Sequence, residues 1–486
     1  MSDNIKSIIE EMRMVYKNDK RPWIIGYSGG KDSTTVVQLV YQMLLELPEK
    51  ERHKKVYLVS SDTLVENPII LMHLKESSRI INKSAKKHKL PLESVIVHPE
   101  IDDTFWTNII GKGFPTPKSS RFRWCTERLK ISPSNKFIKE KVEENGEVIV
   151  LLGVRKAESA ARRQSIEKRE IEGYLLNPHA TLNNTYVYSP IVELTANEVW
   201  KVLLSNGGIS PWGGDNNKLF ALYSDGDGGE CPFILTTNQN KEIETPSCGN
   251  TRFGCWTCTV VQKDRSLTGF IESGEEWLIP LAEFREWLLE IRDERRYRDK
   301  KQRSGRIYRL KVMKDRLSPE EVEVYLNEGY EVRVDEKGRE FFWVKGLGPF
   351  NYEARELILR KLLEAEEEVG IELITIEELK AIEAIWNKEF DIRRDRLCKV
   401  YEEVKERKLP WAKFVKPIFE DEVIEGIEHI AKEYDIEPDL LNKLLILTEQ
   451  HKNYSNKTQY RKEMDKLLNQ EWLHSDIYDE EYIDEN

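Results

Sequence analysis

The ten residues from Ile24 to Ser33, I-I-G-Y-S-G-G-K-D-S, constrain the fold of this chain more than any other stretch. They begin apolar, turn through the adjacent Gly29 and Gly30, and lead into a run with helical spacing. This order predicts a strand, a tight turn and a helix N-terminus. Glycine lets a backbone approach an anion closely, and a helix N-terminus offers free N–H groups and a partial positive charge. We therefore predict a phosphate-binding loop.

The polar side chains of this loop support the same prediction. Two serines add hydroxyl donors and Lys31 adds a mobile positive charge. Because the glycines are adjacent, the loop differs from the common G-x-x-x-x-G-K-[ST] phosphate loop. The alternative is an ordinary strand–helix turn with a surface Lys-Asp pair. We assign nucleotide binding to the loop, which comprises Ser28, Gly29, Gly30, Lys31, Asp32 and Ser33. Within the loop, Lys31 and Asp32 are candidate catalytic residues.

The first 205 residues alternate between apolar, β-branched runs and runs with helical spacing. After the first strand, further strands are expected at 55–60, 94–97 and 148–152, and helices at 3–18, 34–47 and 67–88. This alternation predicts an α/β fold with a parallel, doubly wound sheet. Ligands bind such sheets beyond the carboxyl ends of the strands, where the motifs of this chain also fall.

The rest of the chain changes in character. A turn-rich, cysteine-bearing insertion is expected over 206–274. A mainly helical region follows over 275–474, with helices near 276–296, 353–368, 375–390, 421–434 and 436–451 and a β-hairpin over 330–344. The last segment, 475–486, is an acidic tail. The stretch 292–316 is rich in Lys and Arg, so it is either a contact for a nucleic-acid backbone or a solvated, ion-paired helix.

Composition excludes several classes of protein. The chain has 486 residues, enough for two or three domains, and 39% of them are hydrophobic. Its net charge of −11 excludes a polycation that coats nucleic acid, so any such contact is local. No apolar run approaches the length that spans a bilayer, and residues 1–4 do not begin a secretory signal. We expect a cytoplasmic protein with no membrane partner.

Two motifs follow other strands of the expected sheet. Asp62 comes directly after the second strand, where a carboxylate commonly meets a ribose or base; the alternative is that it caps the next helix. The string G-V-R-K-A-E-S-A-A-R starts at Gly153. If it is helical, Arg155, Glu158 and Arg162 share one face, where the arginines could bind phosphates. The alternative is a solvated ion-pair face.

Four cysteines cluster in the insertion, at Cys231, Cys248, Cys255 and Cys258. Four thiolates can close one tetrahedral metal site, but structural zinc usually uses two C-x-x-C pairs and this stretch has one. The Cys231-Pro232 dipeptide is typical of cluster ligands. Spacing alone leaves an iron–sulfur cluster and zinc open.

A fifth cysteine, Cys125, stands apart in a basic segment. We predict that the neighbouring charges lower its pKa and make it a nucleophile or sulfur carrier, and hence a candidate catalytic residue. The alternative is a small apolar residue at a helix start. The flanking residues are Arg121, Arg123, Arg128 and Lys130, against one acid, Glu127. The sixth, Cys398, is expected to be structural.

These motifs together resemble known families. The S-G-G-x-D-S loop resembles that of PP-loop ATP pyrophosphatases, and the Asp62 and Gly153–Arg162 segments resemble phosphoadenylyl-sulfate reductases. With the Cys125 segment and G-C-W-T-C at 254–258, residues 20–265 resemble the DndC family of bacterial DNA phosphorothioation. The resemblance implies a HUP-like fold, ATP with Mg²⁺, and a [4Fe–4S] cluster on the four clustered cysteines. It implies cleavage of ATP to AMP and pyrophosphate, and replacement of a non-bridging oxygen of the DNA backbone by sulfur.

The resemblance also implies partners and leaves alternatives. A cysteine desulfurase would donate sulfur, and the protein would act on DNA together with DndD and DndE. A phosphoadenylyl-sulfate reductase shares the loop, but such enzymes typically need a Glu-Cys-Gly tail and this chain ends Asp484-Glu485-Asn486. A tRNA thiolase shares the loop and the cluster. A degenerate nucleotide-sensing subunit is the alternative that is not an enzyme.

Overall fold

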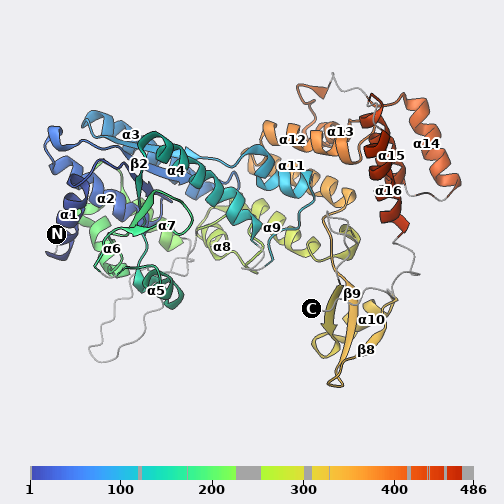
Figure 1. Cartoon of the computed structure of the whole chain (residues 1–486), viewed down its shortest axis with the longest axis horizontal. Coiled ribbons are helices and arrows are strands. Elements are labelled where there is room, and N and C mark those ends of the chain that lie inside the picture. Colours follow the sequence, from blue (N-terminus) through green and yellow to red (C-terminus); the bar gives the residue numbers. More distant parts are fainter. Residues whose placement is uncertain are drawn as a thin grey trace. The chain divides into compact units, whose positions relative to one another are not determined.

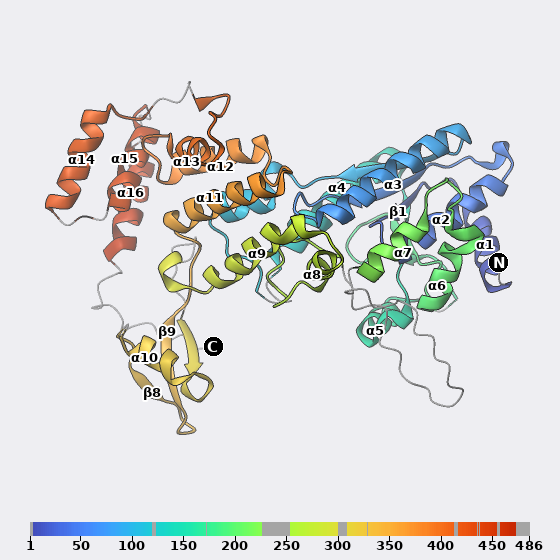
Figure 2. The same cartoon turned by 180° about the vertical axis from the view of Figure 1, so that it is seen from behind.

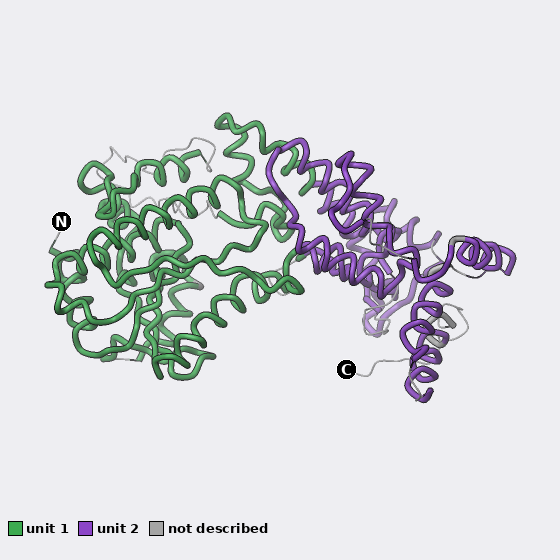
Figure 3. Tube along the Cα trace, turned by 90° about the horizontal axis from the view of Figure 1, so that it is seen from above, with its two compact units in different colours: residues 1–105, 117–285 green, residues 106–116, 286–486 purple. Residues whose placement is uncertain are grey.

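The computed structural model describes residues 3–118, 123–171, 173–225, 253–299, 309–327, 329–412, 417–434, 436, 438–453 and 457–472. The chain divides into two compact units (Figure 3). Unit 1 contains residues 1–105 and 117–285, and unit 2 contains residues 106–116 and 286–486. The boundaries expected from composition, near 205 and 274, stay a prediction.

Unit 1 is built on a six-stranded sheet of order β3-β2-β1-β4-β6-β5. All neighbours are parallel except β5 and β6. The strands are β1 (Trp23–Gly26), β2 (Val56–Ser61), β3 (Leu92–Val97), β4 (Val148–Leu151), β5 (Asn177–Pro178) and β6 (Thr185–Tyr188). The predicted parallel α/β sheet is confirmed, and the expected strands lie within one or two residues of the observed ones.

Helices cover both faces of this sheet because successive side chains of a strand point to opposite faces. Ile25 and Leu151 belong to a core shared with α1, α2, α3 and α6. Ile24 and Val150 point the other way and pack with Ile138 of α4. Figures 1 and 2 show the helices arranged around this sheet. The helices are α1 (Asp3–Lys17), α2 (Lys31–Glu46), α3 (Pro68–Lys87), α4 (Ser132–Asn145), α5 (Ala160–Glu167), α6 (Ala196–Leu203), α7 (Asn216–Asp225) and α8 (Arg265–Glu272). The sheet is therefore doubly wound, as predicted.

Unit 2 combines helices with a small antiparallel sheet. The sheet, of order β7-β9-β8, comprises β7 (Arg309–Met313), β8 (Val332–Val334) and β9 (Glu340–Lys345), beside α10 (Pro319–Asn327). The hairpin predicted over 330–344 is confirmed, and β7 was not predicted. The helices are α11 (Tyr352–Val369), α12 (Ile376–Glu389), α13 (Arg396–Lys405), α14 (Asp421–Glu433), α15 (Pro438–His451) and α16 (Lys457–Trp472).

A short segment from the first half of the chain belongs to unit 2. Residues 107–111 form a π-helical turn there. The Trp106 indole donates to the Leu373 carbonyl (2.8 Å), and the Trp386 indole donates to the Ile110 carbonyl (2.9 Å). Cys398 is buried in the same unit and its thiol donates to Glu383 (3.1 Å). Helix α9 (Ile279–Ile291) contains the point at which the chain passes from unit 1 to unit 2. No helix among the described residues is long and apolar enough to cross a bilayer.

Candidate functional site

The predicted phosphate loop joins β1 to α2 and is held by its own hydroxyls. The Ser28 and Ser33 hydroxyls lie 3.1 Å apart, and the Ser33 hydroxyl also accepts the Ser28 N–H (3.2 Å) and donates to the Gly30 carbonyl (3.1 Å). Gly29 has φ of +73°, a backbone conformation that favours glycine. Helix α2 begins at Lys31, three residues earlier than predicted, so its N-terminal N–H groups belong to the loop. The strand, turn and helix start predicted here are confirmed.

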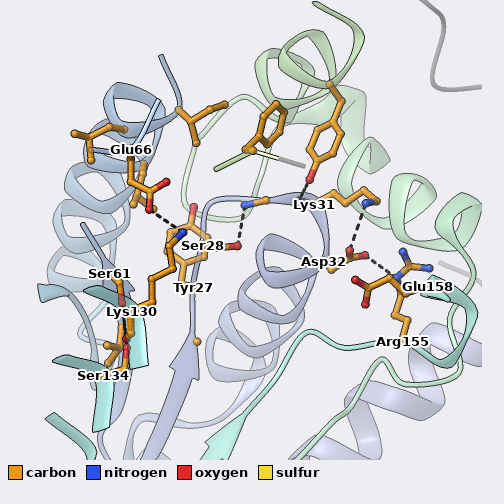
Figure 4. A pocket seen from close by; sticks show the side chains of 18 of the residues that line it. Tyr27, Ser28, Lys31, Asp32, Ser61, Glu66, Lys130, Ser134, Arg155 and Glu158 are labelled. Carbon is orange, nitrogen blue, oxygen red and sulfur yellow. Dashed lines mark hydrogen bonds and ion pairs between the residues drawn. The ribbon is translucent and has the colours of Figure 1, made fainter. Parts of the chain in front are cut away.

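A cavity of about 600 Å³ lies at the carboxyl ends of β1, β2 and β4 and contains this loop (Figure 4). It is lined by both charged and apolar side chains. The lining includes Tyr27, Ser28, Gly30, Lys31, Asp32, Ser61, Glu66, Leu74, Lys130, Ser134, Arg155, Glu158, Arg162, Tyr223 and Phe253. Gly153 follows β4, and a Cβ there would fall 2.9 Å from backbone atoms of Asp32 and Ser33. Glycine at 153 thus permits β4 to end against the loop.

Arg155 does not lie on a helix with Glu158 and Arg162, so the predicted shared face is wrong. The reason is local: Ser159 caps α5 by accepting the Arg162 N–H (3.1 Å), and residues 156–158 form a separate 3₁₀ turn. Arg155 is extended, only 4% exposed, and donates to the Asp32 carboxylate (2.6 Å). Glu158 and Arg162 pair with each other at 3.1 Å. All three nevertheless line the cavity.

Tyr223, on α7, is a site residue that sequence reasoning missed. Its phenol oxygen accepts the Lys31 N–H (3.2 Å), and the Lys31 ammonium lies 5.0 Å from the centre of its ring. Burial raises the pKa of Tyr223, so the phenol stays protonated at neutral pH. The Lys31 ammonium also lies 3.4 Å from the Asp32 carboxylate. No motif marks Tyr223, because its role depends on how α7 packs against the loop.

Asp62 is almost completely buried, with 1% exposure, and does not line the cavity. Its carboxylate accepts the Leu64 N–H (2.9 Å) and lies 3.3 Å from the Lys75 ammonium. It does not cap the next helix, because Asn67 does so by accepting the Ile69 N–H (3.1 Å). The assignment of Asp62 to nucleotide binding stays a prediction.

A second cavity, of about 870 Å³, lies in the same unit and contains three thiols. Cys125, Cys255 and Cys258 line it, together with Arg123 and a stretch from Val260 to Ser266. Lys130 and Phe253 line both this cavity and the cavity that contains the phosphate loop. The two cavities therefore share part of their walls. We refer to them as the loop cavity and the thiol cavity.

The Cys255–Cys258 turn is fixed to the segment after β2. The Asn67 N–H donates to the Gly254 carbonyl (3.2 Å), and the Trp256 N–H donates to the Val65 carbonyl (3.1 Å). On its other side, the buried Arg285 guanidinium donates to the Cys258 carbonyl (2.9 Å). These contacts hold two thiols of a C-x-x-C turn at the wall of the thiol cavity.

Two of the four predicted metal ligands, Cys255 and Cys258, belong to the described part of the chain. Cys231 and Cys248 lie outside the described residues. Within the described part of the chain, no three His, Cys, Asp or Glu side chains are arranged to hold a metal ion. The thiols of Cys255 and Cys258 are the donor type that iron–sulfur clusters and zinc prefer. Cys255 and Cys258 therefore fit an iron–sulfur cluster or a zinc ion as two of its four predicted cysteine ligands.

The prediction that basic neighbours lower the pKa of Cys125 is wrong. Burial raises the pKa of this thiol, the nearby Cys258 raises it further, and Arg123 only partly opposes them. Of the other described cations, Arg128 pairs with Asp103 (2.9 Å), and Lys130 lines the same cavity but pairs with Glu66 (2.8 Å). Arg121 lies outside the described residues. Linear proximity in the sequence overstated the positive charge that reaches this sulfur.

Residues 22–261 match the phosphoadenosine phosphosulfate reductase domain family. This part of the chain is similar to that family, and we refer to it as the reductase-like domain. A curated relative, the uncharacterized protein MJ0066 of Methanocaldococcus jannaschii, is 27% identical over 204 residues, which make up 41% of this chain and 35% of the relative. The chain thus spans about a third of the length of that relative.

Solved structures similar to this chain include two with sulfur-related names. One is the phosphoadenylyl-sulfate reductase of Candida auris, at 14% identity and a TM-score of 0.26, covering 44% of this chain and 90% of that one. Another is the U34-tRNA thiolase NcsA of Methanococcus maripaludis with its [4Fe-4S] cluster, at 13% identity and a TM-score of 0.28, covering 59% of this chain and 79% of that one.

The reductase-like domain contains the loop cavity and the three thiols of the thiol cavity. The phosphate loop, the Gly153–Arg162 segment, Tyr223 and the Cys255–Cys258 turn all fall within residues 22–261.

Proposed function

We propose that this protein cleaves ATP to AMP and pyrophosphate, thereby adenylating a DNA backbone phosphate, and helps to replace a non-bridging oxygen of that phosphate by sulfur. One observation carries the proposal. A phosphate loop and a pocket of thiols occupy adjoining cavities of one reductase-like domain. Adenylation followed by sulfur transfer needs this adjacency, because the activated phosphate must reach sulfur before water hydrolyses it.

The loop cavity supplies the binding of ATP. The N–H groups at the start of α2 and the Lys31 ammonium receive the β- and γ-phosphates. Mg²⁺, when bound with ATP, would share the charge of these phosphates. Arg155, held against Asp32, fixes the carboxylate that faces the loop. These contacts stabilise pyrophosphate as a leaving group.

The chemistry consists of two displacements. A non-bridging oxygen of the DNA phosphate attacks the α-phosphorus of ATP, and pyrophosphate leaves. A sulfur nucleophile then attacks the DNA phosphorus, and AMP leaves with the oxygen that originally belonged to the DNA. The DNA keeps its backbone bonds and gains one sulfur in place of one oxygen.

The sulfur would come from a cysteine desulfurase and arrive in the thiol cavity. Cys125 is the candidate carrier, as a persulfide whose terminal sulfur attacks the DNA phosphorus. An external thiol, such as the excess cysteine supplied to the desulfurase, must then cleave the sulfur–sulfur bond, and a second such thiol completes the reduction, so that Cys125 returns to a free thiol and the sulfur stays on the DNA. Cys255 and Cys258, with Cys231 and Cys248, would hold a [4Fe–4S] cluster, which when bound offers an alternative site for sulfide. DndD, DndE and DNA complete the proposed assembly.

The test is reconstitution with DNA that carries ¹⁸O at its non-bridging phosphate oxygens. The full-length chain is purified without oxygen and mixed with ATP, Mg²⁺, cysteine and a cysteine desulfurase, with and without DndD and DndE. The proposal expects pyrophosphate, ¹⁸O-labelled AMP, and phosphorothioate dinucleotides after nuclease digestion of the DNA. AMP without the label, or ATP cleavage with no sulfur in the DNA under either condition, would contradict it.

A further inference from the structure

The wall between the loop cavity and the thiol cavity carries a cation that no motif predicted to act on the nucleotide. Lys130 lines both cavities, and its side chain is 43% exposed. Its ammonium lies 2.8 Å from the Glu66 carboxylate. Figure 4 shows Lys130 and Glu66 on one side of Ser28, and Asp32, Arg155 and Glu158 on the other. The loop cavity thus has a cation at the end that adjoins the thiols.

Glu66 is itself firmly placed. The Thr63 hydroxyl donates to its carboxylate (3.1 Å), and its backbone pairs with that of Cys255. The Cys255 sulfur lies 3.5 Å from the Thr63 hydroxyl and 3.9 Å from the Glu66 carboxylate. Lys130 is therefore tied, through Glu66, to the turn that carries two of the thiols.

A π-helical turn places Lys130 and Cys125 at the same cavity. Residues 126–131 form this turn, with Cys125 as the residue before it. In an α-helix, residues five apart lie about 140° from each other around the axis, at 3.6 residues per turn. A π-helix repeats its hydrogen bonds every five residues instead, which brings such residues toward one side. Both side chains accordingly line the thiol cavity.

The geometry of displacement at phosphorus gives this cation a function. The attacking and leaving oxygens of a phosphoryl-type transfer lie roughly in line. If the loop holds the β- and γ-phosphates, the acceptor reaches the α-phosphorus from the side opposite the loop. In this structure the side adjoining the thiol cavity is the one that carries Lys130.

We propose that Lys130, positioned by Glu66, holds the α-phosphate from the wall that adjoins the thiol cavity and neutralises the charge that develops there during attack. This role rests on the proposed function, because it assumes that ATP occupies the loop cavity. Lys130 touches the reacting phosphate and is a catalytic residue, whereas Glu66 acts through Lys130 and is a positioning residue.

The test compares Lys130→Met, Lys130→Arg and Glu66→Gln in the full-length, anaerobically purified protein. Lys136→Met is the matched control, because Lys136 also pairs with a glutamate, Glu100 (2.5 Å), but lines neither cavity. Pyrophosphate release gives kcat, equilibrium dialysis gives the affinities for ATP, AMP and adenosine, and metal analysis reports on the cysteine turn.

Loss of a preorganised charge at a reacting oxygen typically lowers kcat by about 10²–10³. We expect Lys130→Met to show this decrease in kcat. Its metal content should be unchanged, and its ATP affinity should change by no more than about tenfold. Lys130→Arg should keep kcat within about tenfold of that of the unaltered protein. The kcat of Glu66→Gln should fall between those of Lys130→Met and Lys130→Arg. Values for Lys130→Met that match Lys136→Met, or equal loss in Lys130→Met and Lys130→Arg, would overturn the proposal.

Nucleotide affinity separates this proposal from the proposed function. If the unaltered protein releases no pyrophosphate, the proposed function fails and the α-phosphate contact is judged by binding alone. Lys130→Met should then weaken the affinity for AMP by about tenfold and leave the affinity for adenosine unchanged, because only AMP carries the phosphate. Equal effects on AMP and adenosine, or no binding of either by the unaltered protein, would overturn the assignment of Lys130.

Discussion

At the scale of single residues, some groups of the site belong to a sequence motif, and others reach the site from distant parts of the chain. Ser28, Ser33 and Lys31 form a recognisable string, and their hydrogen bonds are local. Gly153 and Tyr223 reach the loop from distant parts of the chain. Substitution tests at this scale should therefore separate the local loop from the contacts that complete it.

Gly153→Ala should displace the phosphate loop. The added Cβ would lie 2.9 Å from backbone atoms of Asp32 and Ser33, closer than a van der Waals contact allows. Because these atoms belong to the backbone, the loop itself must shift, and we expect ATP affinity to fall by at least about tenfold. Gly426→Ala is the control, since a Cβ at that position meets no atom within 4 Å. Equal affinities for ATP in the two variants would contradict this account.

Cys125→Ser should leave ATP cleavage intact and abolish sulfur transfer. The serine hydroxyl cannot form a persulfide, and Cys125 lines the thiol cavity but not the loop cavity. The measurement is pyrophosphate release together with phosphorothioate content of the DNA. If modification survives in this variant, Cys125 is not the sulfur carrier.

At the scale of secondary-structure elements, helix starts decide which side chains face the loop cavity. Helix α5 begins after Ser159 and not at Gly153, so Arg155 leaves the helix and buries its guanidinium against Asp32. The π-helical turn at 126–131 likewise changes which side chains share a side. In both cases the local hydrogen-bonding pattern determines the direction of a charged side chain, Arg155 in the first case and Lys130 in the second.

Ser159→Ala should loosen the start of α5. Loss of an N-cap hydroxyl typically costs about 1 kcal/mol. We therefore expect the amide of Arg162, which now donates to the Ser159 hydroxyl, to exchange its hydrogen about fivefold faster in native-state measurements. Ser159→Asp should restore protection, because aspartate is an equally good cap. Unchanged exchange in Ser159→Ala would show that the cap does not limit opening of this helix.

At the scale of the whole molecule, the doubly wound sheet of the reductase-like domain lies within unit 1. Its cysteine turn is anchored to the segment after β2 and to Arg285. The chain as a whole carries a net charge of −11, so contact with DNA requires local cations or a partner. Metal content is the property of the intact protein that most directly tests the proposed sulfur chemistry.

Anaerobic purification should yield about four irons with acid-labile sulfide per chain, which is the content of a [4Fe–4S] cluster. Cys255→Ser should lose them, because a hydroxyl is a poor ligand for iron–sulfur clusters. The measurements are metal analysis and visible absorption, with Cys398→Ser as a control for loss of a thiol outside the site. One zinc and no iron per chain would indicate that the cysteine region has a structural role and that sulfur transfer depends on Cys125 alone.

The sequence by itself determined the parts of this protein that arise from local chemistry. The string from Ile24 to Ser33 is sufficient for a strand, a glycine turn and a helix start, and the alternation of apolar runs is sufficient for a parallel, doubly wound sheet. Both follow from patterns within a few residues, which propensity and periodicity describe.

Only the tertiary structure decided which charges meet which groups. It turned Arg128 to Asp103 and Lys130 to Glu66, and it raised the pKa of Cys125 by burial. It also brought Tyr223 onto the loop. These outcomes depend on contacts between residues far apart in the chain and on the hydrogen-bonding pattern of a single helical turn. Neither leaves a periodic signal in the sequence, so only the folded chain reveals them.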